Sequence, residues 1–356
     1  MLRAMRVIAC VFVFWGCECE LGLAQAEDVV RVFVLAGQSN MEGKAPNALF
    51  EHQANDPKTS DFFARFRKDG KWVAREDVFI KFLDRHGKLT LGYGSPERTG
   101  VELAFGTVLG DHFDDPVLLI KTAWGGHSLV KDFRPPSAGF PNDEYLAREF
   151  KQAQDRIRND NEKNNRDQPL PTLDEIKSEY GESYRDMLKE VQQALQQLGT
   201  LFPELAGKQP VMTGFVWFQG WNDQYGGEGE YASNMEHFIR DIREDFHAPN
   251  LPVVIGVMGQ NGSQPAEGAM LVVQKAQLAM QDIPDFAKNV RSVRTDLLID
   301  KAAEELYPNW RDNFEEWQKV GGDFGYHYLG SAVWFCRIGD AMGSAMLELV
   351  EPSSNQ

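Results

Sequence analysis

The sequence has few cysteines, and three of its four lie within the first nineteen residues. Only Cys336 belongs to the body of the chain. A single cysteine cannot form an internal disulfide, which excludes the small folds that disulfides hold together. The chain must therefore be stabilised by a hydrophobic core. Its 356 residues, 42% of them hydrophobic, are enough to form one large domain.

Long apolar stretches are also missing beyond the amino terminus, so no membrane span is expected there. Basic residues are in the minority: 53 acidic residues against 37 basic ones give a net charge of −16. This charge disfavours the phosphate backbone of a nucleic acid as a partner. What remains is an extracytoplasmic enzyme or binding protein.

The first 26 residues have the pattern of a secretory signal peptide. Two arginines precede an apolar segment at residues 7–16, and Ala24–Ala26 matches a small-residue cleavage site. Cleavage there leaves 356 − 26 = 330 residues, which we expect to form a single domain over 27–356. Lipid attachment at Cys17 is a weaker alternative, because Phe14 does not fit the small aliphatic pattern expected ahead of such a cysteine. We therefore expect a secreted or periplasmic protein.

Apolar runs alternate with helical patterns along the rest of the chain, which is typical of a parallel sheet with crossover helices. The predicted strands are Val29–Ala36, Val117–Thr122, Thr213–Phe218, Val253–Met258 and Val290–Thr295. The predicted helices include Glu102–His112, Tyr231–Phe246 and Gly330–Leu349. The fold class expected from this order is α/β.

One segment departs from the alternation. Residues 143–208 are highly charged and carry only a narrow apolar stripe, so we expect a helical insertion between two strands. An insertion that follows a strand end can also wall a binding groove.

An apolar run that ends at a glycine and leads to a serine between two amides is the most informative segment. Val32–Ala36 fits a strand buried on both faces, and Gly37 permits a sharp turn after it. Ser39 would then lie at the carboxyl end of a strand, where open α/β sheets place their ligands. A serine at this place is equally suited to cap the following helix. The segment alone therefore predicts either a nucleophile or a helix cap.

A nucleophilic serine needs a base. Of the seven histidines, His127 and His327 lie beside glycines at predicted element ends. His327 lies in a glycine-rich loop before the last helix, with Asp323 four residues upstream. A carboxylate at the far ring nitrogen would fix the tautomer and stabilise the imidazolium that forms when Ser39 attacks. We therefore predict His327 as the base and interpret His127 as a groove or surface residue.

Donors for an oxyanion are expected where two further strands end. Gly125 and Gly126 follow one strand, and their N–H groups can approach a substrate closely because no Cβ blocks them. Gln219 and Asn222 follow another strand and offer neutral amide donors.

These segments together resemble the blocks of the SGNH hydrolases, in particular the sialate O-acetylesterase-like and acetylxylan esterase carbohydrate esterases. The resemblance is carried by Gly37–Met41, Gly125–Gly126, Gln219–Asp223 and the loop ending in His327, and Gly100–Gly106 is similar to a further segment of the family. It implies a flavodoxin-like three-layer α/β/α fold with a central parallel sheet. It also implies that neither a metal nor another cofactor is needed.

Site residues follow from the resemblance position by position. Ser39 is the implied nucleophile, and its own N–H joins the oxyanion hole. Gly125 or Gly126 supplies a second N–H, and His327 is the implied base.

Two positions depart from the family's pattern. Trp221 stands where the esterase branch usually has glutamate, so we expect Gln219 to be the oxyanion amide, with Asn222 as the alternative. Asp323 lies one residue farther from His327 than the family's aspartate does. Either Asp323 completes a catalytic triad, or the enzyme uses a Ser–His dyad.

The remaining site predictions concern the substrate. We expect Gln38 and Asn40 to be substrate-binding, and Trp124 and Trp221 to stack on sugar faces. The predicted function is a serine esterase that removes O-acetyl groups from carbohydrate, such as an acetylated polysaccharide or sialic acid. A lipid or thioester hydrolase and a non-catalytic glycan-binding protein of the same fold are the alternatives.

Overall fold

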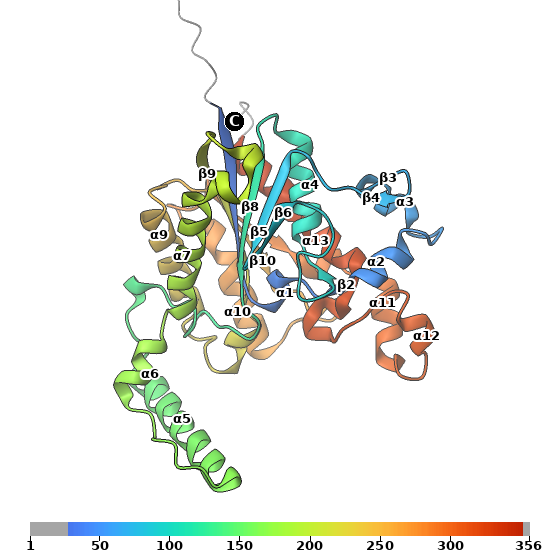
Figure 1. Ribbon diagram of the computed structural model, residues 1–356. Helices are drawn as coiled ribbons and strands as arrows, with labels where there is room; N and C mark the ends of the chain where they lie inside the picture. Colours follow the sequence, from blue (N-terminus) through green and yellow to red (C-terminus); the bar gives the residue numbers. More distant parts are fainter. Residues whose placement is uncertain (1–27, 352–356) are drawn as a thin grey trace, which may run out of the picture.

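A seven-stranded sheet forms the centre of the computed structural model, which describes residues 28–351 (Figure 1). Neighbouring strands run parallel, except for the pair at one edge, which is antiparallel. In spatial order the strands are β11 (Val290–Arg294), β10 (Val253–Val257), β9 (Gln209–Phe218), β1 (Val29–Gly37), β8 (Val117–Ala123), β5 (Val78–Phe82) and β6 (Arg85–Lys88). The predicted signal peptide and Cys17 lie outside the described residues.

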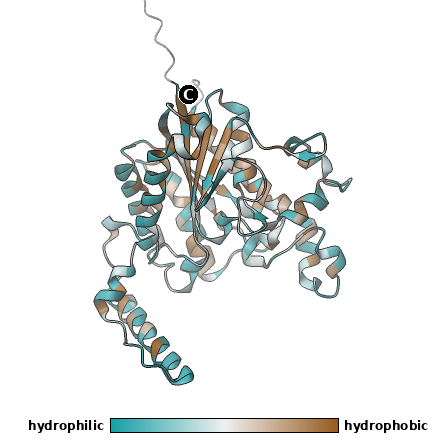
Figure 2. Ribbon diagram, viewed as in Figure 1, coloured by the Kyte–Doolittle hydropathy of each residue, from teal (hydrophilic) through white to brown (hydrophobic). Residues whose placement is uncertain are grey.

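Helices cover both faces of the sheet and give three layers. Val30, Val32 and Val34 of β1 join the cluster formed with α7 (Glu182–Gln196), α9 (Tyr231–Asp245) and α10 (Gly268–Ala279). Phe33 and Leu35 point to the other face and join the cluster with α4 (Glu102–His112) and α13 (Ala332–Val350). Successive residues of a strand face opposite sides, so a strand between two helical layers is apolar throughout. Figure 2 shows the hydrophobic strands inside this shell.

Further helices, two small strand pairs and several 3₁₀ segments complete the described part of the chain. The other helices are α1 (Ser39–Glu42), α2 (Asn47–Gln53), α3 (Ser60–Phe63), α5 (Asp143–Asn164), α6 (Leu173–Glu179), α8 (Leu198–Leu201), α11 (Lys301–Leu306) and α12 (Phe314–Trp317). Two small antiparallel pairs join β2 (Ala45–Pro46) to β7 (Arg98–Thr99) and β3 (Arg67–Lys68) to β4 (Lys71–Trp72). The 3₁₀ segments η4 (Trp221–Tyr225), η7 (Tyr307–Asn309) and η8 (Gly325–Gly330) lie in loops.

The three-layer α/β/α prediction is confirmed, and each of the five predicted strands is present. The sequence reasoning missed β5 and β6, which extend the sheet beyond β8. β6 is the edge strand and reads Arg-His-Gly-Lys, so it has no apolar signal. β5 contains only five residues with Lys81 among them, and a run this short is easily overlooked.

The charged segment 143–208 divides into two parts with different roles. α5 and α6 project away from the body of the molecule (Figure 1), and their surfaces are mostly polar (Figure 2). α7 is instead a regular layer helix, since Tyr184, Met187 and Val191 are buried against the sheet. The protruding insertion is therefore shorter than the segment expected from the sequence.

Within residues 28–351, no helix is long and apolar enough to cross a membrane. Cys336 is buried on α13, and the high apolar content of its surroundings raises the pKa of the thiol.

Candidate active site

The site begins where β1 ends between its two neighbours. Gly37 pairs with Ala123 of β8 on one side and with Phe218 of β9 on the other. A Cβ on Gly37 would lie 2.2 Å from the carbonyl oxygen of Phe218, so no larger residue fits. The parallel register therefore brings three strand ends, and the loops that follow them, to one edge of the sheet.

Ser39 is the first residue of α1, directly after this edge. The cap position belongs to Gln38, whose side chain makes no capping hydrogen bond. The helix-cap interpretation of Ser39 is therefore wrong. Its backbone N–H lies in the first turn, where α-helices leave donors unpaired, and remains available to an oxyanion.

The two amides beside Ser39 are buried and bonded to neighbouring loops. Gln38 and Asn40 are each only 2% exposed. The side-chain oxygen of Gln38 accepts from the Gly220 N–H at 3.2 Å, and its Nε2 donates to Asn222 Oδ1 at 3.0 Å. Nδ2 of Asn40 donates to the carbonyl oxygen of Tyr326 at 3.1 Å. Both amides therefore fasten loops around Ser39, and their role in substrate binding stays a prediction.

The glycine pair lies beside Ser39, but its two N–H groups differ. A Cβ on Gly125 would lie 3.7 Å from the Cβ of Ser39, so the turn adjoins the serine. The Gly125 N–H donates to Oε1 of Glu42 at 2.6 Å and is therefore occupied. A Cβ on Gly126 would meet no atom within 4 Å. Gly126 is the better candidate of the two for the oxyanion hole.

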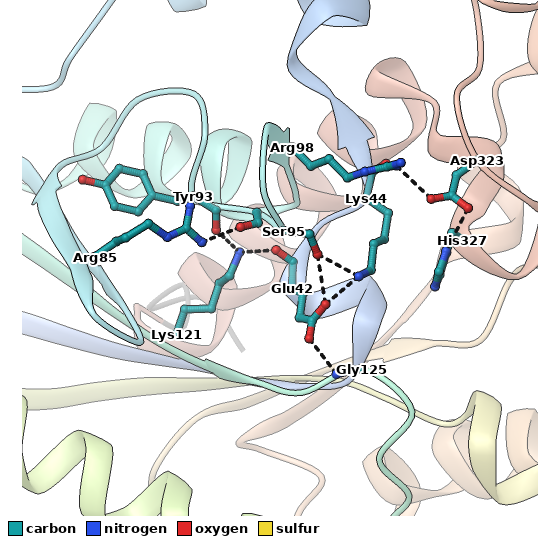
Figure 3. A network of polar contacts seen from close by, with 11 residues as sticks. Glu42, Lys44, Arg85, Tyr93, Ser95, Arg98, Lys121, Gly125, Asp323 and His327 are labelled. Carbon is teal, nitrogen blue, oxygen red and sulfur yellow. Dashed lines mark hydrogen bonds and ion pairs between the residues drawn. The ribbon is translucent and has the colours of Figure 1, made fainter.

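Glu42 holds this turn in place (Figure 3). Its Oε2 accepts from Lys44 Nζ at 2.6 Å and from the Ser95 hydroxyl at 3.0 Å. Burial raises the pKa of Glu42, but the hydrogen bond and charge of Lys44, with the Gly125 N–H and Ser95, lower it below its usual value. An ionised Glu42 is the acceptor that this arrangement requires.

The last turn of α1 rests on a buried ion pair. Nζ of Lys121 donates to the Glu42 carbonyl at 2.7 Å and to Oε2 of Glu102 at 2.9 Å, and both charged side chains are inaccessible to solvent. Oε1 of Glu102 also accepts from the Gly100 N–H at 2.8 Å. This contact gives the Gly100–Gly106 segment a structural role beneath the site.

Asp323 and His327 are brought together despite their spacing. His327 Nδ1 lies 3.0 Å from Asp323 Oδ1, and the Phe324 N–H donates to the same oxygen at 2.7 Å. The other carboxylate oxygen accepts from Arg98 Nη1 at 2.8 Å (Figure 3). Burial raises the pKa of Asp323, but these hydrogen bonds and the charges of His327 and Arg98 outweigh it and lower the pKa. The ring nitrogen left to act on a substrate is Nε2.

The loop that carries His327 is tightly held. Tyr328 and Leu329 have φ values of +52° and +60°, which side chains with a Cβ rarely adopt. Tyr328 is fully buried, and its hydroxyl accepts from the Gly259 N–H at 3.0 Å and lies 2.8 Å from the Thr295 hydroxyl. These bonds compensate the backbone strain and fix the loop to the end of the sheet.

The two candidate oxyanion amides have different surroundings. Gln219 is 3% exposed, and its Nε2 donates to Asp223 Oδ2 at 2.6 Å and to the His127 carbonyl at 3.1 Å. Asn222 is half-buried, and only its Oδ1 is engaged, by Gln38. This corrects the preference stated from the sequence: the amide with a free N–H donor is Asn222.

Asp223 is part of the same framework. The backbone N–H groups of Leu129 and Val130 donate to it at 2.9 and 2.8 Å, and complete burial raises its pKa to about 6. Asp223 therefore joins the loop after β8 to the loop after β9 and has no exposed surface for chemistry.

The remaining predicted residues surround the site. Trp124 is half-buried and packs near His127, whose Nδ1 lies 2.6 Å from the Ser183 hydroxyl. Trp221 is also half-buried, and its ring centroid lies 5.8 Å from that of Tyr326. The sequence did not point to Glu42 and Arg98, because charged residues in such short elements carry no signal that separates them from ordinary surface residues.

Comparison with known proteins finds a family match and similar solved structures. The family model described as carbohydrate esterase, sialic acid-specific acetylesterase, matches residues 29–165 and 171–304. A search of curated proteins gives no match. Two solved structures are similar at low identity: a protein of Arabidopsis thaliana (16% identity, TM-score 0.46, covering 89% of this chain and 98% of that one) and a carbohydrate acetylesterase of Xanthomonas citri (13%, 0.44, 90% and 56%).

The fold and the family match define a carboxylic ester hydrolase. The chain belongs to the carbohydrate esterase family of sialic acid-specific acetylesterases, whose activity is removal of O-acetyl groups from carbohydrate. The matched residues include Ser39 and both candidate amides but end before Asp323 and His327.

The amide assignment can be tested by comparing substitutions. We expect Asn222→Ala to lower kcat by about 10²–10³, because it removes a donor to the transition state. Asn222→Asp is a second variant that keeps the acceptor for Gln38 but replaces the N–H donor by a negatively charged oxygen, so it should lose at least as much. Gln219→Ala should instead lower the free energy of unfolding by about 1–3 kcal/mol, because buried Asp223 loses a partner. Steady-state kinetics measures kcat, and urea unfolding measures stability. The assignment would be contradicted if Gln219→Ala lost kcat and Asn222→Ala lost stability instead.

The Asp323 carboxylate should affect both activity and the pH dependence of stability. The folded-state pKa of Asp323 lies below the ordinary 3.8, so its stabilisation is complete above pH 4 and is lost as the pH falls through the folded value. The stabilisation of wild type relative to Asp323→Asn should therefore be present at pH 5 and shrink as the pH falls below about 4. Near pH 7 the variant should lose roughly 10³–10⁴ in kcat, because an amide cannot hold the same imidazole tautomer.

The control for Asp323→Asn is Asp155→Asn on the exposed surface of α5. This variant should change neither kcat nor the pH dependence of the unfolding free energy. A stability difference that stays constant down to pH 3 would show that Asp323 is not held as a carboxylate by the fold.

Proposed function

We propose that the chain deacetylates carbohydrate through an acetyl-enzyme formed on Ser39, with His327 as the base and Asp323 as the residue that orients it. The observation that carries the proposal is the 3.0 Å contact between Asp323 Oδ1 and His327 Nδ1, which leaves Nε2 for proton transfer. The link from Asn40 to the Tyr326 carbonyl supports it further, because it fastens the histidine loop to the turn that carries Ser39.

The reaction would proceed in two halves. Ser39 Oγ attacks the acetyl carbonyl while His327 Nε2 takes its proton. The tetrahedral oxyanion is stabilised by the N–H groups of Ser39 and Gly126 and by Nδ2 of Asn222. The imidazolium then gives its proton to the departing sugar oxygen. In the second half His327 deprotonates a water molecule that attacks the acetyl group, and acetate leaves as Ser39 regains its proton.

Ser39→Ala should abolish hydrolysis of 4-nitrophenyl acetate while the protein remains folded, because it removes the hydroxyl on which the acetyl-enzyme would form. Thermal unfolding measures the fold, and labelling by a fluorophosphonate probe should be present in wild type and absent in the variant. Normal turnover by a folded variant would refute the proposal. In wild type, a series of acyl chain lengths should show preference for acetyl; a preference for long chains would favour a lipid or thioester hydrolase, and absence of labelling would favour a glycan-binding protein.

We also propose that the protein is exported, on the basis of the amino-terminal pattern of residues 1–26. Expression of the full chain in a bacterial host should give a mature protein that begins at Glu27, as measured by amino-terminal sequencing. A lipid-modified Cys17 in the mass spectrum would instead support anchoring, and a chain that retains Met1 in the cytoplasm would contradict export.

A further inference from the structure

A row of exposed aromatic rings leads away from His327. The centroids of the Tyr326 and His327 rings are 4.4 Å apart. Tyr326 stacks on Phe324 at 5.4 Å with an interplanar angle of 17°, and its ring centroid lies 5.8 Å from that of Trp221. Tyr326 and Phe324 are 39% and 48% exposed, whereas large aromatic side chains are mostly buried in folded proteins.

The row continues into a cavity of about 280 Å³ behind Asp323. Phe324 lines it together with the aromatic residues of the α11–α12 segment, Tyr307, Trp310, Phe314 and Trp317. Phe314 is 53% exposed, and its ring centroid is 6.3 Å from that of Trp310. Gln318 also lines the cavity and is exposed, so an amide that can donate and accept hydrogen bonds lies among the rings.

From this arrangement, and resting on the proposed function, we propose that the aromatic row and cavity bind further sugar units of a neutral acetylated glycan chain whose acetylated unit lies at Ser39. We call the row and the cavity together the aromatic tract: Trp221, Tyr326, Phe324, Trp310, Phe314 and Trp317. Flat apolar rings with a few polar groups suit the apolar face and hydroxyl rim of a pyranose. Continuity with His327 joins the tract to the reacting ester.

The charge around the tract favours a neutral glycan over an anionic one. Residues 301–324 contain three basic and six acidic residues, a net charge of 3 − 6 = −3. Arg98 is the cation among the residues that line the cavity, and its charge is paired with Asp323. An anionic chain would therefore meet repulsion along this path. Most of the tract lies beyond residue 304, where the family match ends.

The experiment uses partially acetylated xylo-oligosaccharides of one to six units as neutral probes, with O-acetylated sialic acid and 4-nitrophenyl acetate for comparison. In wild type, kcat/KM for acetate release should rise with chain length. Phe314→Ala should lower kcat/KM for the hexamer by about tenfold, since an exposed ring loses the apolar contact that the sugar would cover. Its kcat/KM for 4-nitrophenyl acetate and for the monosaccharide should remain within twofold. The matched control is Phe140→Ala, because Phe140 is 54% exposed and packs on Tyr180, away from the tract.

A second measurement separates this inference from the proposed mechanism. Unacetylated xylohexaose should bind to Ser39→Ala in calorimetry, and more weakly by a similar factor to the Ser39→Ala, Phe314→Ala double variant. If Ser39→Ala still hydrolysed esters, the proposed mechanism would be refuted. The binding of xylohexaose would still test whether the aromatic tract holds a glycan chain. In the kinetic experiment, the inference is overturned if kcat/KM of wild type does not depend on chain length, if wild type prefers O-acetylated sialic acid to the hexamer, or if Phe314→Ala affects all substrates equally. In calorimetry, it is overturned if xylohexaose binds equally well to Ser39→Ala and to the double variant.

Discussion

The close packing of three parallel strand ends is the constraint on which the site depends. Gly37 lies between Ala123 and Phe218, and the 2.2 Å separation that a Cβ would have from the Phe218 carbonyl leaves room only for glycine. Because the strands are parallel and in register, the chain leaves all three at the same edge. Ser39, the glycine pair and the amide loop are therefore neighbours although they come from distant parts of the sequence.

Polar contacts then fix what the strand ends bring together. One set runs from the Gly125 N–H to Glu42 and on to Lys44, whose carbonyl accepts from Arg98. Arg98 also holds Asp323, so the serine side and the histidine side of the site are connected by one network (Figure 3). Charged hydrogen bonds of this kind are stronger than neutral ones, and they hold reacting groups in a fixed geometry before a substrate arrives.

The proposed preference for a substrate depends on the surface around this fixed centre. The candidate catalytic residues come from the sheet edge and from the loop that carries His327, whereas the aromatic tract is supplied mainly by the α11–α12 segment and residues 324–326, with Trp221 from η4. A rigid sheet can keep the chemistry constant while loops and short helices around it vary, because these segments carry little of the core. The neutral, aromatic character of the tract thus adds a preference to the deacetylation chemistry.

The sequence by itself determined the alternation of strands and helices, the place of Ser39 after a buried strand, and the acidic, disulfide-poor class of the chain. Its patterns suffice for these because apolar periodicity and glycine report local backbone geometry. Tertiary structure alone decided which side chains meet. It engaged Gln38 and Asn40 in bonds between loops, left Asn222 rather than Gln219 with a free donor, and brought Asp323 Oδ1 within 3.0 Å of His327 Nδ1. Hydrogen-bond partners distant in sequence depend on the packed fold, and no local pattern encodes them.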